Sequence, residues 1–295
     1  IPWPEPVNDG ALDLSSTNLS IFGIGSQNIS PTVRIFGRPD NRLWVAGIKM
    51  SNGEVLMVDS PLNQAWTRSL INAAKEAGVQ HLIYTSFQRN NETETSPLWL
   101  VAQSHIQTEK WLKESGMKYT LLRNNLYMDF LPAFIGENVL ETGGIYLPAG
   151  QGKVSAVLRS EMAEAAANIL TTSGHEGKEY NFSNTVAVSY PEMAQWISEV
   201  SGKQINYTSP TAEDYAKTLQ NFGVPAEIIG LFSSFTVAQA EGELALVSTD
   251  LENLLGRKPT SVKDFLSTQE VKKLQDIAFE DGVMRKHAFD LNDQT

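Results

Sequence analysis

Short apolar strands alternate with amphipathic helices between residues 54 and 201, and this alternation constrains the fold more than any other feature of the chain. Chains with this pattern form α/β structures in which helices cover a mostly parallel sheet. Gly78 and Gly116 follow two of the helical patterns, at the position where glycine commonly ends a helix. The expected strands occupy residues 54–59, 81–84, 119–122 and 179–182, and the expected helices occupy residues 63–77, 100–115, 159–171 and 190–201.

The beginning of the chain has a different pattern. No stretch before Asn63 has both the length and the period of a helix. Ser51-Asn52-Gly53 lies between two apolar runs, and Asn-Gly in that setting is a strong signal for a β-hairpin. We therefore expect an atypical β-rich segment here, with strands at residues 19–23, 33–36 and 43–49.

Helical patterns dominate after residue 201. They are expected at residues 212–222, 226–243, 248–255 and 259–265. The last of these begins near Thr260 or Ser261, which are good residues for a helix N-terminus. The patterns predict four parts: a β-rich segment over 1–54, an α/β core over 55–200, a helical subdomain over 201–271 and a polar tail over 272–295.

Charge and cysteine content exclude several classes of protein. The net charge of −11 argues against nucleic acid or an anionic membrane surface as the main partner. No apolar run approaches the roughly 18–20 residues that a membrane-spanning helix needs. The chain has no cysteine, which rules out disulfides, thiolate metal sites and cysteine catalysis. A reducing compartment is compatible with this, and we expect a cytoplasmic protein.

Polar side chains follow two of the expected strands. Thr85 and Ser86 come directly after the strand at 81–84, and Arg123, Asn124 and Asn125 follow the strand at 119–122. Ligands of open parallel sheets lie beyond the carboxyl ends of the strands. We therefore expect these residues to share one crevice, although Thr85 and Ser86 would also suit an ordinary strand end.

His105 and Glu109 are one turn apart on the helix expected between these strands. They could be no more than a pair on the helix surface. A zinc site is not indicated, because the other ligands and a HExxH pattern are missing. A hydrolase triad with Ser86 is not indicated either, because no GxSxG turn occurs. We predict no metal.

Four segments carry a resemblance to a known family: INAAKEAGVQHLIYTS (71–86), SPLWLVAQSHIQTEKWLKESGMKYTLLRNNLY (96–127), GHEGKEYNFSN (174–184) and LLGRKPTSVKDFL (254–266). The chain resembles the NmrA-like branch of atypical short-chain dehydrogenases, within the group of NADPH-dependent quinone oxidoreductases of type 2 and triphenylmethane-dye reductases. The resemblance implies a Rossmann-like domain that holds NADPH and C-terminal helices that close a pocket over the nicotinamide. It also implies a small aromatic or quinone substrate and a possible homodimer.

The resemblance places cofactor contacts along the core. Ser60 and Pro61 would line the adenosine side of NADPH, and Thr85 and Ser86 would lie beside the nicotinamide ribose. Asn124 would flank the nicotinamide.

The resemblance also implies residues near the reaction. His105 stands where related dehydrogenases have the lysine of a YxxxK pair, and Asn125 and Tyr127 would flank the nicotinamide and the substrate. The tyrosine acid of other short-chain dehydrogenases is missing. Hydride transfer to a quinone needs no strong protein acid, because the cofactor supplies the difficult chemistry. His105 would donate or relay a proton to the reduced oxygen.

The first 54 residues depart from the family pattern. The family begins with a strand, a GxxGxxG turn and a helix whose N-terminus receives the pyrophosphate. The nearest counterpart here is the segment from Gly23 through Gly25 and Gln27 to Ile29, in which only Gly23 and Gln27 are in register. Arg38 would be the remnant of an arginine that grips a 2′-phosphate.

Three explanations of this beginning stay open. The domain has lost the dinucleotide and kept the substrate pocket, or it binds NADPH through a rebuilt loop at residues 23–26, or the first residues derive from an altered gene. Two other functions stay open as well. One is a nucleotide-sensing regulatory protein without turnover, and the other is a cofactor-free isomerase or cyclase that reuses the pocket.

Overall fold

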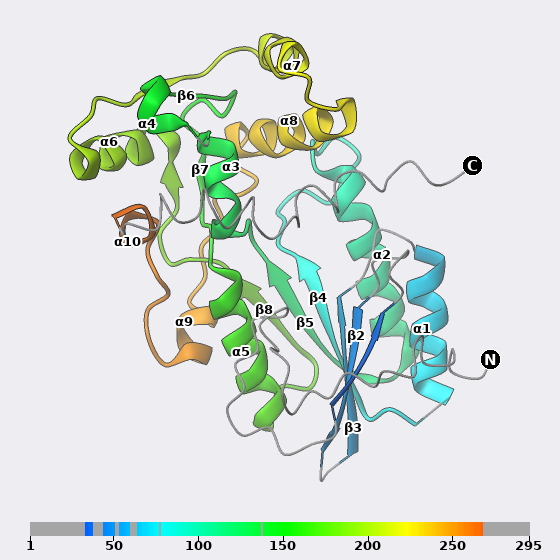
Figure 1. Cartoon of the computed structure of the whole chain (residues 1–295). Coiled ribbons are helices and arrows are strands. Elements are labelled where there is room, and N and C mark those ends of the chain that lie inside the picture. The colour runs from blue at the N-terminus through cyan, green and yellow to red at the C-terminus, as the bar shows by residue number, and fades with distance from the viewer. Residues whose placement is uncertain are drawn as a thin grey trace.

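The computed structural model describes residues 33–37, 44–50, 53–59, 64–76, 78–136 and 138–267 (Figure 1). Six of the predicted cofactor residues lie outside this part of the chain, as do the strand predicted at 19–23 and the tail predicted after residue 271. These six are Gly23, Gly25, Gln27, Arg38, Ser60 and Pro61.

A six-stranded sheet forms the centre of the molecule, with its strands in the order β1-β2-β3-β4-β5-β8. The four strands from β3 to β8 run parallel, which confirms the predicted α/β core. The two pairings at the other edge, β1 with β2 and β2 with β3, are antiparallel. The strands are β1 Val33–Gly37, β2 Trp44–Met50, β3 Gly53–Asp59, β4 His81–Phe87, β5 Lys118–Asn124 and β8 Lys178–Phe182.

Helices cover both faces of the sheet (Figure 1). Helices α1 (Gln64–Glu76) and α2 (Trp99–Ser115) lie on one face, and α5 (Arg159–Thr171) and α9 (Asp250–Leu255) lie on the other. Since crossovers from one parallel strand to the next use helices in this way, the helices bury the sheet from both sides.

The pleat of the strands divides the core into two clusters. Leu82, Tyr84 and Leu121 pack with residues of α1 and α2, whereas Ile83 and Leu122 pack with residues of α5. Successive residues of a strand point to opposite faces, which accounts for this division up to the end of β4, where Phe87 packs near His105 of α2.

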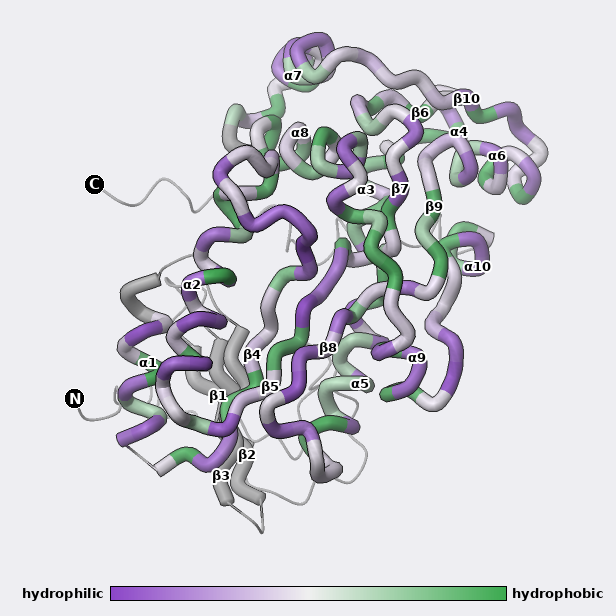
Figure 2. Tube along the Cα trace, turned by 180° about the vertical axis from the view of Figure 1, so that it is seen from behind, coloured by the Kyte–Doolittle hydropathy of each residue, from purple (hydrophilic) through white to green (hydrophobic). Residues whose placement is uncertain are grey.

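A layer of short elements lies beyond the carboxyl ends of the parallel strands (Figure 1). Helix α8 (Ala226–Ala240) is the longest element of this layer. Figure 2 shows hydrophobic stretches along α8 and along the segments that join this layer to the sheet. The other elements are η2 Met128–Phe130, α3 Leu131–Ile135, α4 Val139–Thr142, β6 Gly144–Tyr146, β7 Lys153–Val154, β9 Val188–Ser189, α6 Tyr190–Ser201, β10 Asn206–Thr208, α7 Ala212–Asn221 and α10 Val262–Ser267.

Two small sheets hold this layer together. β10 pairs with β6 in parallel, and β7 pairs with β9 in antiparallel orientation. The β6–β10 pair joins a segment of the predicted core to a segment of the predicted helical subdomain. The boundary predicted at residue 201 stays a prediction.

Local signals explain the helix ends that the sequence predicts well. The Ser189 and Glu192 side chains form a capping box at the start of α6, and Gly202 closes the helix with a φ of 68°. Helix α8 ends earlier than the predicted residue 243, because Gly242 adopts a φ of 83° just after it. Helix α10 begins at Val262, after Ser261, whose hydroxyl accepts a hydrogen bond from the Asp264 N–H.

Candidate functional site

The predicted tips of β4 and β5 lie side by side at the carboxyl edge of the sheet. The two strands are parallel, and their register places Ser86 beside Arg123 and Phe87 beside Asn124. The structure therefore brings the two polar strand ends together.

The pleat nevertheless separates these residues into two faces. Ser86 and Arg123 point toward α2, since both bind Glu109 of that helix. By alternation, Thr85 and Asn124 lie on the face of Ile83 and Leu122, which α5 covers. The expected shared crevice is thus two half-sites on either side of one sheet edge.

Glu109 is the centre of the α2-side half-site. Its carboxylate accepts a hydrogen bond of 2.6 Å from the Ser86 hydroxyl. Arg89 donates to both carboxylate oxygens at 2.9 and 3.0 Å, and Arg123 donates to both at 3.0 and 2.6 Å. Arg123 also forms an ion pair of 2.9 Å with Glu179 of β8. We call Ser86, Arg89, Glu109 and Arg123 the ion-pair cluster.

The electrostatics of the cluster keep Glu109 charged. Burial alone would raise the pKa of this carboxyl, whose residue is only 3% exposed. The hydrogen bonds from Arg123, Arg89 and Ser86 outweigh burial and lower the pKa of Glu109 to about 2. All of the oxygens and most of the donors in this cluster are occupied, so it holds the two strand ends and the following loop in place.

His105 lies near this cluster and has a different partner from the one its spacing suggests. Its Nδ1 is 2.8 Å from the Tyr84 hydroxyl, and its ring centroid is 6.4 Å from that of Phe87. Burial, with a smaller contribution from Arg89, lowers the pKa of His105 to about 4. The imidazole is therefore neutral near pH 7. A proton donated by His105 near pH 7 would therefore come from the N–H of a neutral imidazole and not from a charged imidazolium.

Asn124 is the main polar group of the α5-side half-site. It is 8% exposed, and its Oδ1 is buried without a hydrogen-bond partner among the described residues. Buried amide oxygens are nearly always hydrogen-bonded, and an unpaired one is costly. This oxygen is placed to accept a hydrogen bond from a group that enters the site.

The side chain of Asn125 forms three hydrogen bonds within the fold. Its Nδ2 donates to Gln88 Oε1 at 2.7 Å and to the Leu244 carbonyl at 3.3 Å, and its Oδ1 accepts from the Leu126 N–H at 2.7 Å. It is 2% exposed. These contacts connect the strand tip to the loop after β4 and to the chain beyond α8, so they suit a positioning residue better than a group that touches substrate.

Tyr127 borders the same face as Asn124. It forms an isolated bridge with Val157, and its ring packs on the cluster that includes Ile83 and Leu122. Its ring centroid is 5.7 Å from that of Phe130. Tyr127 and His105 thus lie on opposite sides of the sheet, and a ligand that touches both must lie across the strand ends.

Aromatic side chains connect the strand ends to the layer above them. Phe87 meets Phe235 of α8 edge to face, with ring centroids 6.3 Å apart. Phe134 and Phe232 lie closer together, at 4.7 Å. Phe232 and Phe235 are only partly buried. Partly buried phenyl rings of this kind suit contact with a flat apolar molecule.

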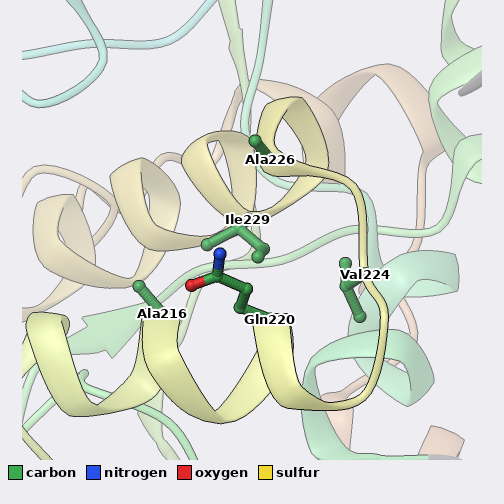
Figure 3. A pocket seen from close by; sticks show the side chains of 5 residues that line it. All are labelled: Ala216, Gln220, Val224, Ala226 and Ile229. Atoms are coloured by element: carbon green, nitrogen blue, oxygen red, sulfur yellow. The ribbon is translucent and has the colours of Figure 1, made fainter.

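A separate hollow of about 250 Å³ lies between α7 and α8 (Figure 3). The described side chains that line it come from these two helices and the turn between them, and none of these is ionisable: Ala216, Gln220, Val224, Ala226 and Ile229. None of the predicted site residues contributes to it, and the strand-end site does not depend on it.

Two further properties concern the described part of the chain. Its acidic and histidine side chains form no group of three or more that could hold a metal ion. None of its helices combines the length and the apolar character that crossing a bilayer requires.

The sequence profile of the NmrA-like family matches residues 60–266, which include every described residue of the site. The chain belongs to the NmrA-like family. Quinone oxidoreductase 2 of Escherichia coli (strain K12) is 36% identical over 200 residues, which are 68% of this chain and 68% of that protein. The NAD(P)H azoreductase of Xenophilus azovorans is 26% identical over 204 residues, 67% of this chain and 68% of its own. The family membership predicted from the sequence is confirmed.

The fold is similar to that of solved relatives. The triphenylmethane reductase of Citrobacter sp. in complex with NADP(H) matches with a TM-score of 0.64 and 33% identity, over 73% of this chain and 75% of that one. The α/β fold with a Rossmann-type parallel sheet is confirmed by this match and by the strand order.

Proposed function

We propose that this chain is an NAD(P)H-dependent oxidoreductase that reduces a planar, electron-poor substrate such as a quinone. The two relatives described above are named as a quinone oxidoreductase and an azoreductase, and the solved reductase is a complex with NADP(H). The unpartnered Oδ1 of Asn124 at the carboxyl edge is the observation in this chain that carries the proposal.

Asn124 fits the nicotinamide end of the cofactor. Its buried amide oxygen lacks a donor within the described residues, and the carboxamide of a nicotinamide carries N–H donors. Thr85 belongs to the same face and would border the nicotinamide ribose. Ser86 would support this position from the opposite face, where its hydroxyl is already bound to Glu109. When bound, NADPH supplies the hydride.

His105 and Tyr127 would hold the substrate from the two sides of the strand ends. The hydrogen bond between Tyr84 and His105 orients the imidazole. If the Tyr84 hydroxyl donates to Nδ1, the remaining proton is on Nε2 and can be donated to an acceptor oxygen. We assign Asn125 a positioning role, since its side chain ties the strand tip to Gln88 and Leu244.

The proposal is tested by mixing the purified protein with NADPH and a benzoquinone and following the loss of reduced-nicotinamide absorbance. We expect quinone-dependent oxidation in the wild type and at least about tenfold weaker NADPH binding in Asn124→Ala, the loss of roughly one well-placed hydrogen bond. Asn253→Ala, an exposed position on α9, serves as the matched control. Absence of NADPH binding in the wild type would contradict the proposal.

A nucleotide-sensing role without turnover is the second candidate. The buried oxygen of Asn124 would bind a nucleotide whether or not turnover follows, so the same observation supports this role. Measuring NADPH binding together with quinone-dependent oxidation separates these functions. NADPH binding with quinone-dependent oxidation supports the reductase, binding with no oxidation by any quinone or azo dye supports the sensor, and no binding supports a cofactor-free enzyme.

A further inference from the structure

The loop over residues 88–98 connects β4 to α2, the helix that carries His105, and we call it the β4–α2 loop. Gln88 at its start accepts a hydrogen bond of 2.7 Å from Asn125 of the strand-end site. Residues 92–95 at its tip are exposed. Because loops are more mobile than the strands and helices they connect, contacts from outside the loop decide how firmly it borders the site.

Hydrogen bonds within the β4–α2 loop shape its turns. Asn91 Oδ1 accepts from the N–H and from the hydroxyl of Thr93, at 3.1 and 2.7 Å. The Ser96 hydroxyl accepts from the Leu98 N–H at 3.1 Å, just before α2 begins. Since each of these bonds joins residues two positions apart, they define local turns and do not place the loop against the layer beyond the strand ends.

Glu243 supplies a contact from that layer. Its Oε1 accepts a hydrogen bond of 3.0 Å from Asn91 Nδ2, and its Oε2 accepts one of 2.6 Å from the Ser96 hydroxyl. We call these two bonds the Glu243 tether. The backbone beside the carboxylate is anchored to the site, because the carbonyl of the next residue, Leu244, accepts from Asn125 Nδ2. A glutamine side chain has one oxygen and could accept from only one of the two donors, so the arrangement calls for a carboxylate.

Glu243 differs from the other buried glutamates of the described residues, since no Lys or Arg among these residues forms an ion pair with it. Glu109 binds the two arginines of the ion-pair cluster, and Glu161 binds Arg257 at 2.7 Å. Glu243 is 6% exposed, and its side-chain donors are an amide and a hydroxyl. Burying a carboxylate costs free energy, and neutral donors offset that cost less fully than an arginine does. Stability alone therefore does not account for a carboxylate at this position.

The Glu243 tether lies close to two aromatic side chains that border the proposed substrate position. Phe87 is the last residue of β4, immediately before the loop, and Phe235 belongs to α8, which ends shortly before Glu243. The two ring centroids are 6.3 Å apart, and that of Phe87 is 6.4 Å from the ring of His105. The tether thus joins the segment after Phe87 to the segment after Phe235, and it limits how far the two rings can separate.

We infer that Glu243 is a positioning residue of the proposed reductase, which holds the β4–α2 loop and α8 at the separation that a flat substrate needs. The inference rests on the proposed function and adds a residue to its substrate side. The tether reaches the loop, whereas Asn124, which carries the proposed nicotinamide contact, belongs to β5. Loss of the carboxylate should therefore impair use of the quinone and leave NADPH binding unchanged.

Steady-state kinetics of the full chain with a benzoquinone at saturating NADPH tests this inference. Glu243→Met keeps the length of the side chain and removes both acceptors. It should raise the KM for the quinone about tenfold, the size of roughly one lost hydrogen bond. The kcat should stay within about twofold of the wild type, because no group that touches the substrate changes.

Three further variants separate the tether from a general loss of structure. Glu243→Gln keeps one acceptor, so its KM should lie between those of the wild type and Glu243→Met. Adding Ser96→Ala to Glu243→Met should change the KM little further, because both substitutions remove the same hydrogen bond. Glu241→Gln, at an exposed position at the end of α8, is the matched control and should change neither constant.

Hydrogen–deuterium exchange measures the loop without turnover. Peptides that cover residues 88–98 should exchange faster in Glu243→Met than in the wild type, and peptides that cover β5 should not. Faster exchange of the loop with an unchanged KM for the quinone would give the tether a purely structural role, which overturns the inference and leaves the reductase intact. Unchanged exchange of the loop, or weaker NADPH binding in Glu243→Met, also overturns it. A wild type that binds NADPH and oxidises it with no quinone overturns the proposed function and the inference together.

Discussion

The two faces of the strand ends differ in how their polar groups are satisfied. On the α2 side, Glu109 binds Ser86, Arg89 and Arg123, and its carboxylate oxygens are saturated. On the α5 side, Asn124 has a buried oxygen without a partner in the described structure. A saturated polar cluster stabilises the fold, whereas an unsatisfied one costs free energy unless a ligand completes it. Position at the carboxyl edge therefore does not by itself identify a binding residue.

The largest loss of stability is expected for Glu109→Gln. The substitution removes the buried anion that Arg89 and Arg123 share and leaves them only the more exposed Glu92 and Glu179, and breaking a buried ion pair costs up to about 3 to 5 kcal/mol of unfolding free energy. Urea unfolding measures it. Glu114→Gln, at an exposed position of the same helix, is the control. A loss no greater than that of the control would show that the cluster is not structural.

The pH dependence of His105 is next in size. The folded-state pKa of His105 is about 4, below the ordinary value of 6.5. Between pH 4 and 6.5 the unfolded chain therefore binds more protons than the folded chain. The contribution of His105 to the free energy of unfolding is complete above pH 6.5. It is lost as the pH falls from 6.5 through 4, and the total loss is about 3 kcal/mol. Wild type and His105→Gln are compared by urea unfolding at several pH values. If the unfolding free energy of the two proteins changed equally with pH, the low pKa of His105 would be contradicted.

Two adjacent asparagines then give a direct contrast. Asn125→Ala leaves the Gln88 oxygen and the Leu126 N–H without their partner and should cost about 2 kcal/mol. Asn124→Ala removes an oxygen that has no partner in the described structure, so we expect a loss of less than about 1 kcal/mol, together with weaker nucleotide binding. Thermal unfolding and calorimetric titration of both variants measure the contrast. If Asn124→Ala were less stable than Asn125→Ala, the proposed difference between the two asparagines would be wrong.

The smallest effect is expected for Tyr84→Phe. It removes the hydroxyl that lies 2.8 Å from His105 Nδ1 and should cost about 1 kcal/mol. Nuclear magnetic resonance titration of the imidazole provides the second readout, because loss of this hydrogen bond changes the environment of Nδ1. An unchanged imidazole signal would show that the ring is oriented by other contacts. Tyr119→Phe, on the neighbouring strand and outside the site, is the control.

The sequence predicted the elements around the site better than the facing of their side chains. The hairpin signal at 51–53 and the helix at 190–201 depend on local chemistry, and the structure confirms both, together with the predicted parallel sheet. The strands at 81–84 and 119–122 were predicted too short, since β4 extends to Phe87 and β5 to Asn124. Residues expected beyond the strands are therefore part of them, and the pleat sends neighbours to opposite faces.

Long-range partners account for the rest of the difference. Helical spacing paired His105 with Glu109, but the structure gives His105 a partner on β4 and gives Glu109 two arginines. Arg89 carried no signal, because it lies in a polar loop with no motif around it. The short elements between residues 128 and 158 were missed as well, since two to five residues are too few to show a period.

The sheet order equals the chain order, and this has a consequence for how such a protein can change. Each of the five strands after β1 pairs with the strand of this sheet that precedes it in the chain. Among the described strands, the β2–β3 pairing connects β1 and β2 to the rest of the sheet. Ancestral recombination upstream of Gly53 could therefore exchange one end of the sheet while leaving the pairings of β3, β4, β5 and β8 intact.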